Sequence, residues 1–567
     1  MLPWRHHASK RRPYRGTPAL ACAVFCATLL GVIVLGHEDG RVAQLMALAA
    51  PALAWLVWPV RSLRVHRLRT VAVCLWAMVF AVDGIVRAYL LEAYQAAPDS
   101  SVVIGAAANT NARESAEYLS MHWRTLVAWS GVLAAAAAVF LRTAPRGARA
   151  GMAGVPGAQD AGAAAQAGMR PRWSRGSVAV LALCLLAGSV GFASKSWRRL
   201  HPVLFWTQWS QQVGSLRAGW ADQQRQRDAA LQRARAASPT LVQAGPSTIV
   251  LVLTDSINRD NMGLYGYRRA TTPRLQAHKA QLQEQMLVMR HAWSVDASTL
   301  PSVHNILRFG EPDERDPHHV LALARAAGYK TWWMSNHDDI GIEQQHARMA
   351  DVVEIVNRTP GRAGASLDGE LLDCLQEALE DPTERKLIVV HFLGAHPHYN
   401  LRFPPGANPF DDTVDGVETE LEERGRSAWV RRFRQEYDAA ILYADFVVSQ
   451  TLQLARTVGR PDGYRAWMFL SDHGQEVGHN GNHAGHSPQT ASGYRIPALV
   501  WSNRPRAPQE DAAAIEARPF RTDWAAWTIA DLARLRWTGD ATERDALRPG
   551  YRWQDPVLPV PVASFRE

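Results

Sequence analysis

A chain of 567 residues is too long for one ordinary domain, so at least two structural units are expected. Its net charge is +9, but the Arg and Lys residues gather in short stretches beside apolar runs, at 5–15, 61–69 and 170–175. Membrane topology predicts basic residues in such places, and no basic stripe with interleaved aromatic residues occurs, so no nucleic acid partner is expected. Four of the five cysteines lie in apolar runs and only Cys374 lies elsewhere, so an exported domain must be stable without an internal disulfide.

Residues 1–195 predict a helical transmembrane domain, because apolar segments that can cross a hydrocarbon core of ~30 Å recur there. We count about five spans, at Pro18–Gly36, Val42–Val60, Thr70–Val86, Trp123–Leu141 and Val178–Ala193. A cleaved signal peptide is the alternative for the first segment, but further apolar segments follow it and no convincing cleavage site is present.

The distribution of charge predicts the orientation of these spans. The segment before the first span is basic, and so are 61–69 and the loop that follows the fourth span, whereas 37–41 and 88–122 are not. All three basic segments can be cytoplasmic only if the amino terminus lies inside. Five crossings then place everything after Ala193 on the outer side of the membrane.

Two further regions follow the spans. Residues 196–245 are polar and rich in Arg and Gln, and we expect an amphipathic, helical linker at the membrane surface. Residues 246–567 read as a separate domain in which β-rich runs such as Thr248–Leu253, Lys386–Phe392 and Ala466–Leu470 alternate with helical patterns. This alternation predicts an α/β domain with a mainly parallel central sheet, whose ligands gather beyond the carboxyl ends of the strands.

Candidate metal ligands follow the first and last of these runs. Asp255 comes directly after the first, and Asp472 and His473 come directly after the last. Carboxylate oxygens and an imidazole on neighbouring strand ends can converge on one divalent ion, and zinc suits such a mixed set. Gly474 allows the backbone to turn sharply at this point.

Two other features carry less weight taken alone. Several of the histidines at 473–486 are separated by Gly and Asn, a composition that suits a loop lining a polar site better than a core helix. Thr299 precedes a helical pattern, where a threonine is usually only a cap. A threonine hydroxyl needs a base or a metal before it can act as a nucleophile.

The sequence resembles the bacterial phosphoethanolamine transferases of the lipid A and lipopolysaccharide core type, members of the alkaline phosphatase/sulfatase superfamily. The shared motifs occur in the same order over about 250 residues: Thr254-Asp255-Ser256, Leu264-Tyr265-Gly266-Tyr267, Thr299-x-x-Ser302-Val303, Asp368-Gly369-Glu370, His391-x-x-Gly394-x-His396-Pro397, Tyr437-Asp438, and Ser471-Asp472-His473-Gly474. In the outer loop between two predicted spans, Thr110-Asn111-x-x-Glu114 also resembles a motif of these enzymes.

The resemblance implies a fold and a set of roles. The fold is an alkaline-phosphatase/sulfatase-like domain outside the membrane, anchored in the bacterial inner membrane. Asp255, Thr299, Asp472 and His473 would hold a zinc ion, with room for a second ion, and Thr299 would be the nucleophile that becomes phosphorylated. His396 and either His486 or His483 would contact the phosphate and assist proton transfer, with His486 preferred for catalysis. Thr110 and Glu114 would help to hold the lipid head group, together with His396 and His483.

Some positions depart from the family pattern. Asp255 stands where the family usually has Glu, and Gln475 and His479 replace carboxylates that are common there. Ala106 occupies a position that is often Asn. The first departure still suits a metal, whereas the Gln475 and His479 replacements bear on a second metal site.

The resulting expectation is a metal-dependent enzyme that transfers phosphoethanolamine from phosphatidylethanolamine to lipid A or the lipopolysaccharide core in the periplasm. A sulfatase would need Cys or Ser in a Cys/Ser-x-Pro-x-Arg context, which Thr299 lacks. A phosphoglycerol transferase would share the threonine and the anchor but favour manganese and phosphatidylglycerol. A non-catalytic envelope scaffold is the third alternative, and the intact set of Asp255, Thr299, Asp472 and His473 argues against it.

Overall fold

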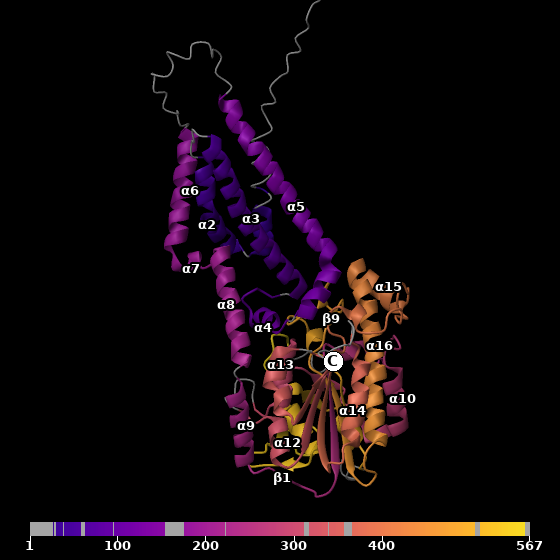
Figure 1. Cartoon of the computed structure of the whole chain (residues 1–567). Coiled ribbons are helices and arrows are strands. Elements are labelled where there is room, and N and C mark those ends of the chain that lie inside the picture. Colours follow the sequence, from indigo (N-terminus) through magenta and orange to yellow (C-terminus); the bar gives the residue numbers. More distant parts are fainter. Residues whose placement is uncertain are drawn as a thin grey trace, which may run out of the picture. The chain divides into compact units, whose positions relative to one another are not determined.

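The computed structural model describes residues 27, 30–37, 39–57, 63–94, 96–110, 112–152, 175–221, 223–310, 317–337, 339–356, 366–504 and 511–561. The chain divides into two compact units (Figure 1). The first is Met1–Leu91 with Ala116–Gln212, and the second is Glu92–Ser115 with Val213–Glu567. The segment between two of the predicted spans therefore belongs to the same unit as the α/β domain, and the linker predicted at 196–245 is shared between the two units.

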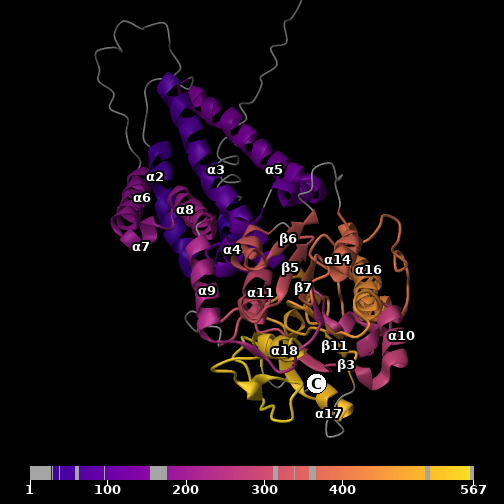
Figure 2. The same ribbon diagram turned by 60° about the horizontal axis from the view of Figure 1, so that its bottom comes forward.

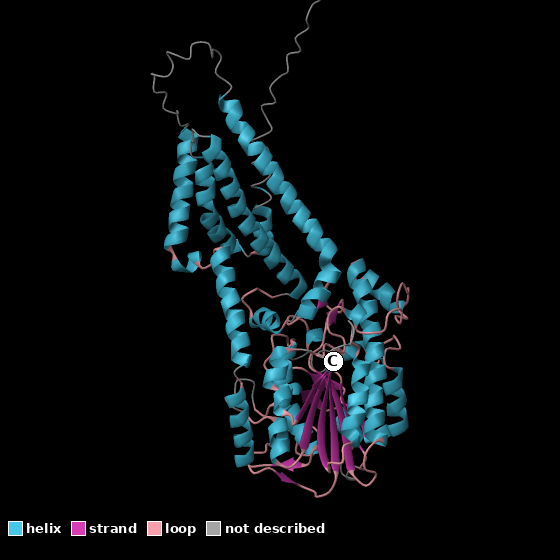
Figure 3. Ribbon diagram, viewed as in Figure 1, coloured by secondary structure: helices cyan, strands magenta, loops and turns pink. Residues whose placement is uncertain are grey.

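The first unit is helical (Figure 3). Its main helices are α2 (Asp39–Val57), α3 (Leu63–Tyr94), α5 (Ala112–Met152) and α6 (Arg175–Ala193), followed by the short α7 (Lys195–Arg198). Among the described residues, Arg64–Glu92 and Glu114–Arg142 are long and apolar enough to cross a membrane, and Leu181–Ala193 is a shorter apolar helix. Four of the predicted spans coincide with helices, whereas Pro18–Gly36 lies largely outside the described residues, so the number five stays a prediction.

The second unit alternates strands with helices. Its helices are α4 (Ser101–Asn109), the part of α8 (Pro202–Ala221) that begins at Val213, α9 (Gln224–Ala236), α10 (Pro273–Leu282), α11 (Thr299–Leu307), α12 (Val320–Ala326), α13 (Ile340–Gln345), α14 (Leu371–Glu380), α15 (Gly416–Glu423), α16 (Ala428–Thr457), α17 (Ala512–Glu516) and α18 (Ala525–Leu532). Its main strands are β2 (Ser247–Thr254), β3 (Met286–Val288), β5 (Lys330–Ser335), β6 (Val352–Ile355), β7 (Arg385–Phe392), β8 (Tyr464–Ser471) and β11 (Ala498–Ser502). Short strand pairs are formed by β1 (Thr240–Leu241) with β13 (Leu535–Arg536), β4 (His291–Trp293) with β12 (Pro519–Arg521), and β9 (Glu476–Val477) with β10 (Ala484–Gly485).

The central sheet has seven strands in the order β3-β11-β8-β2-β7-β5-β6. The pairings from β8 through β2, β7 and β5 to β6 are all parallel, as the alternating pattern predicts. The prediction of a mainly parallel sheet needs one correction, because β11 runs antiparallel to both β8 and β3 and makes the sheet mixed. The chain does not cross over through a helix between β8 and β11, so β11 returns beside β8 in the opposite direction.

Helices cover both faces of the central sheet (Figure 2), and the side chains of β2 alternate between the two cores on these faces. Because successive side chains of a strand point to opposite faces, Ile249, Leu251 and Leu253 belong to the core that includes α11, α12 and α18. Val250 and Val252 belong to the core that includes α10, α14 and α16. Strands buried on both faces require a continuous apolar run, which is the pattern that identified β2, β7 and β8 in the sequence.

Candidate metal centre and active site

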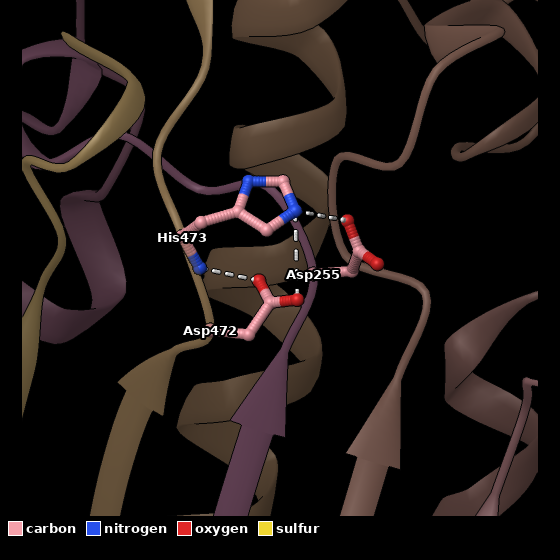
Figure 4. A group of neighbouring side chains, drawn as sticks. All are labelled: Asp255, Asp472 and His473. Atoms are coloured by element: carbon pink, nitrogen blue, oxygen red, sulfur yellow. Dashed lines mark hydrogen bonds and ion pairs between the residues drawn. The ribbon is translucent and has the colours of Figure 1, made fainter. Parts of the chain in front are cut away.

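The register of the parallel strands gathers the candidate metal ligands at one edge of the sheet. Thr254, the last residue of β2, lies opposite Ser471, the last residue of β8. Asp255 and Asp472 are therefore neighbours beyond the same edge, with His473 beside them. The ligand atoms of the three side chains all lie within 4.8 Å of one another, and all three residues are buried. Figure 4 shows them converging from the ends of these strands.

Hydrogen bonds fix the orientation of the Asp472 and His473 side chains. Asp472 Oδ1 accepts from the backbone N–H groups of Ser256 (3.0 Å) and His473 (2.6 Å). His473 Nδ1 lies 2.7 Å from the carbonyl oxygen of Gly474 and donates to it, so Nε2 is turned toward the carboxylates. His473 Nε2 lies 3.6 Å from Asp472 Oδ2 and 3.8 Å from Asp255 Oδ1.

Backbone conformation supports this arrangement at Ser256. Its φ is +63°, in the left-handed region that non-glycine residues rarely adopt. In this conformation its N–H bonds Asp472, and its carbonyl oxygen accepts from the Tyr437 hydroxyl at 2.6 Å. Strain of this kind persists only where the surroundings impose it, and it is concentrated at functional sites.

The electrostatics of the pair of carboxylates favour a cation between them. Burial and the nearby Asp255 charge raise the pKa of Asp472 to about 7. Burial would also raise the pKa of Asp255, but the imidazoles of His396, His473 and His337 outweigh it and bring that pKa below its ordinary value. Two buried carboxyls so close together resist ionising together unless a positive charge lies beside them. In the part of the chain that the structure describes, Asp472 Oδ2 is buried and has no hydrogen-bond partner. The donor set therefore fits a divalent metal ion.

Thr299 is the first residue of α11, one position inside the helix that the sequence placed it before, and Ser298 occupies the N-cap position. Its hydroxyl donates to Asp255 Oδ2 at 2.9 Å and lies 3.4 Å from His473 Nε2. The candidate nucleophile and the three candidate metal ligands therefore form one cluster. A hydroxyl next to a metal site and a carboxylate can become an alkoxide more readily than a free hydroxyl.

The structure also places the candidate proton-transfer residues. The ring centroid of His486 lies 4.8 Å from that of His473, whereas His483 Nε2 lies 3.1 Å from the carbonyl oxygen of His486. His486 is therefore the residue whose ring faces the metal centre, and His483 contacts its backbone. Burial lowers the pKa of His486 to about 3 and that of His396 to about 4.

Thr110 and Glu114 follow α4 in the same unit. The Thr110 hydroxyl donates to the carbonyl oxygen of Ala106 at 2.8 Å, and its own carbonyl oxygen accepts from Arg217 at 2.6 Å. Glu114 lies in the first turn of α5. Their roles toward a lipid head group stay predictions.

Sequence reasoning did not single out His337, which the structure brings to the centre. His337 Nε2 lies 3.7 Å from Asp255 Oδ2, and its ring stacks on that of His391 with centroids 4.4 Å apart. The signal was present, because Asn336 and His337 directly follow β5. It became informative only once β5 was known to pair with β7, which in turn pairs with β2.

Comparison with known proteins agrees with this architecture. The chain belongs to the sulfatase family, whose model matches residues 247–533. It is similar to phosphoethanolamine transferase EptC of Escherichia coli, with 28% identity over 323 residues that cover 54% of each chain. It is also similar to phosphoethanolamine transferase CptA of Salmonella typhimurium, with 26% identity over 324 residues, again 54% of each chain. The chain spans about half the length of the curated relatives it matches.

A solved structure matches the same region. The crystal structure of the C-terminal periplasmic domain of EptC from Escherichia coli in complex with Zn gives a TM-score of 0.50 at 28% identity, covering 55% of this chain and 89% of that chain. The resemblance inferred from the motifs is therefore confirmed.

Proposed function

We propose that this protein is a zinc-dependent phosphoethanolamine transferase that acts on an acceptor of the bacterial envelope. The observation that carries the proposal is the cluster of Thr299 with Asp255, Asp472 and His473, in which a hydroxyl, two carboxylates and an imidazole converge at the sheet edge. Relatives named as phosphoethanolamine transferases and the zinc complex of one of them support the choice of reaction and of metal.

Asp255, Asp472 and His473 would hold the zinc ion beside the Thr299 oxygen. When bound, zinc supplies positive charge that favours the threonine alkoxide and offsets charge developing on the phosphoryl oxygens. The proposal needs one bound ion.

The chain's own residues then carry out two transfers. In the first, a bond forms between Thr299 Oγ1 and the phosphorus of phosphatidylethanolamine, while the bond from phosphorus to the diacylglycerol oxygen breaks. The proton lost by Thr299 is passed, through His396 or His486, to the departing oxygen. In the second, a hydroxyl or phosphate of the acceptor attacks the same phosphorus, and Thr299 recovers a proton. The low pKa values of both histidines keep them neutral near pH 7.

The apolar helices of the first unit and the basic segments beside them support an inner-membrane anchor with the amino terminus in the cytoplasm and the catalytic unit in the periplasm. Such an anchor suits a lipid donor. Lipid A or the lipopolysaccharide core is the acceptor that the family resemblance favours. The residues we assign to the donor's head group are Thr110, Glu114, His396 and His483.

The test is release of diacylglycerol from fluorescent phosphatidylethanolamine by the purified full-length protein, combined with mass spectrometry of Thr299. We expect zinc-dependent release and a phosphoethanolamine adduct on Thr299. Both should vanish in T299A and persist in S298A, which removes the neighbouring hydroxyl. Release of diacylglycerol from phosphatidylglycerol alone would show that phosphatidylglycerol, and not phosphatidylethanolamine, is the donor. An adduct on another residue would refute the assignment of Thr299 as the nucleophile.

A further inference from the structure

The segment between the third and fourth predicted spans, which contains α4, is linked to the metal centre by a chain of buried contacts. It begins at Asn109, the last residue of α4, whose Oδ1 accepts from the Gly341 backbone N–H at 3.0 Å. The Asn109 side chain also hydrogen-bonds the carboxylate of Asp339, which contributes to the low pKa of that carboxyl against the effect of burial. One amide side chain thus holds both the residue before α13 and its second helical residue.

The contacts continue from Asp339 to the candidate nucleophile. Asp339 Oδ2 lies 3.4 Å from His337 Nδ1, and His337 Nε2 lies 3.7 Å from Asp255 Oδ2. The same Asp255 oxygen accepts the hydrogen bond of Thr299. Asn109 is 8% exposed, Asp339 6% and His337 4%, so little solvent competes for these contacts.

The α4 end of this chain is itself held in place. Arg217 on α8 donates to the carbonyl oxygens of Ala107 (3.1 Å), Ala108 (2.6 Å) and Thr110 (2.6 Å). A guanidinium at these positions satisfies carbonyls that the last turn of a helix leaves unpaired. Packing is close here as well, because a Cβ at Gly341 would lie 2.9 Å from Leu300 Cδ2 and 3.2 Å from the Trp220 ring.

We propose that Asn109 is a positioning residue for the transfer reaction: through Asp339 and His337 it fixes the Asp255 carboxylate that holds the metal and accepts the Thr299 hydrogen bond. The expected change in kcat rests on the proposed function, but the residues that carry the inference are not the metal ligands themselves. It gives α4 a mechanical role in the catalytic centre, separate from any contact of Thr110 or Glu114 with a lipid.

The test compares N109A and N109D with S100A in the purified full-length protein. Ser100 caps the other end of α4 by accepting from the Val103 N–H and has no part in the chain of contacts. N109D keeps the size of the side chain and the oxygen that accepts from Gly341, but it places a second carboxylate against Asp339. The two readouts are zinc affinity, measured by competition with a chromogenic chelator, and kinetics at saturating zinc with the soluble diester p-nitrophenyl phosphoethanolamine.

Residues one layer outside a metal centre typically change affinity or activity by about 10- to 100-fold. We expect N109A to lower kcat about tenfold with KM within about twofold, and to weaken zinc binding about tenfold, at the low end of that range. N109D should lose more than N109A, and S100A should match the wild type. In a D339N background, N109A should cause little further loss, because both changes break the same chain of contacts.

Several results would overturn the proposal. The first is that N109A and N109D match S100A in both zinc affinity and kinetics. The second is that N109A raises KM and changes nothing else. The third is that the effects of N109A and D339N add together. The first would leave Asn109 a structural residue, and the second would make it a contact of the head group. If the wild type fails to release diacylglycerol from phosphatidylethanolamine, the proposed function fails, and the zinc affinities of the same variants still decide this inference.

Discussion

Proton binding at Asp472 should govern how tightly the protein holds zinc. Its pKa lies at about 7, against an ordinary 3.8. One pKa unit is worth about 1.36 kcal/mol, so ionising this carboxyl in the zinc-free folded protein costs roughly 4 kcal/mol more than in the unfolded chain. Because the folded-state pKa is raised, the contribution of this group to stability is complete at a pH below about 4. It is lost as the pH rises to about 7.

Zinc reverses the preference for the protonated form, because a metal ligand must be deprotonated. Below pH 7, each zinc ion that binds displaces the Asp472 proton. It also displaces any proton on His473, whose pKa is lowered by burial but raised overall by the charges of Asp472 and Asp255. Zinc affinity should therefore fall about ten- to a hundredfold for each pH unit below 7, corresponding to one or two displaced protons, and change much less above it.

The measurement is chelator competition at pH 5.5 to 8 on the purified protein, with D472N as the comparison. D472N should bind zinc more weakly at every pH, and its affinity should depend on pH with a slope smaller by one proton. The zinc-free wild type should also lose stability between pH 5 and 7, while the zinc-free D472N protein should lose less. A zinc affinity that is constant between pH 5.5 and 7, or an unchanged slope in D472N, would refute the reasoning.

Three further predictions concern residues that support the site. Gly394 has φ +56°, and a Cβ there would lie 2.6 Å from the Asp255 carbonyl oxygen. The G394A substitution should therefore lower stability by about 1–3 kcal/mol, measured by thermal unfolding, and weaken zinc binding, measured by chelator competition. Asp438 is buried and pairs with buried Arg269 at 2.8 Å. Denaturant titration of D438A should show a loss of stability of about 3–5 kcal/mol, because the Arg269 charge is left buried without this partner. A loss below about 1 kcal/mol would contradict a stabilising role of this ion pair. Asp445 accepts from two backbone N–H groups in the first turn of α10. The D445A substitution should lower stability by about 1–2 kcal/mol and leave kcat per folded molecule unchanged. A selective loss of kcat would instead point to a role of Asp445 in the active site.

Much of the central site could be predicted from the sequence, because it depends on local patterns. Apolar runs identify β2 and β8, and the polar residues that follow them must lie at the carboxyl edge of the sheet if the strands are parallel. Asp255, Asp472 and His473 come together for that reason. Family motifs added Thr299, which comes from a helix and which strand patterns alone do not reach.

Other features depend on the order of the strands and on the orientation of side chains, and the sequence does not predict them. The reversal of β11 follows from the path of the chain after the site, and no residue within the strand encodes it. The choice between His483 and His486 depends on which ring faces His473, and their spacing in the chain left both open. His337 approaches Asp255 only because β5 and β2 flank the same strand, β7.

The strand order also explains why several family motifs are needed around one small centre. His391 ends next to Ser335 in the sheet register, so the segments after β5 and β7 leave the sheet side by side. Asp368 joins them by accepting from Asn336 Nδ2 (2.9 Å) and from the Leu393 and Gly394 N–H groups (2.9 and 2.8 Å). This buried carboxylate supports the turn at Gly394, whose backbone packs on Asp255. The motif at Asp368 therefore acts on the metal centre through backbone position, which is why its aspartate can be essential to the geometry without touching a ligand atom.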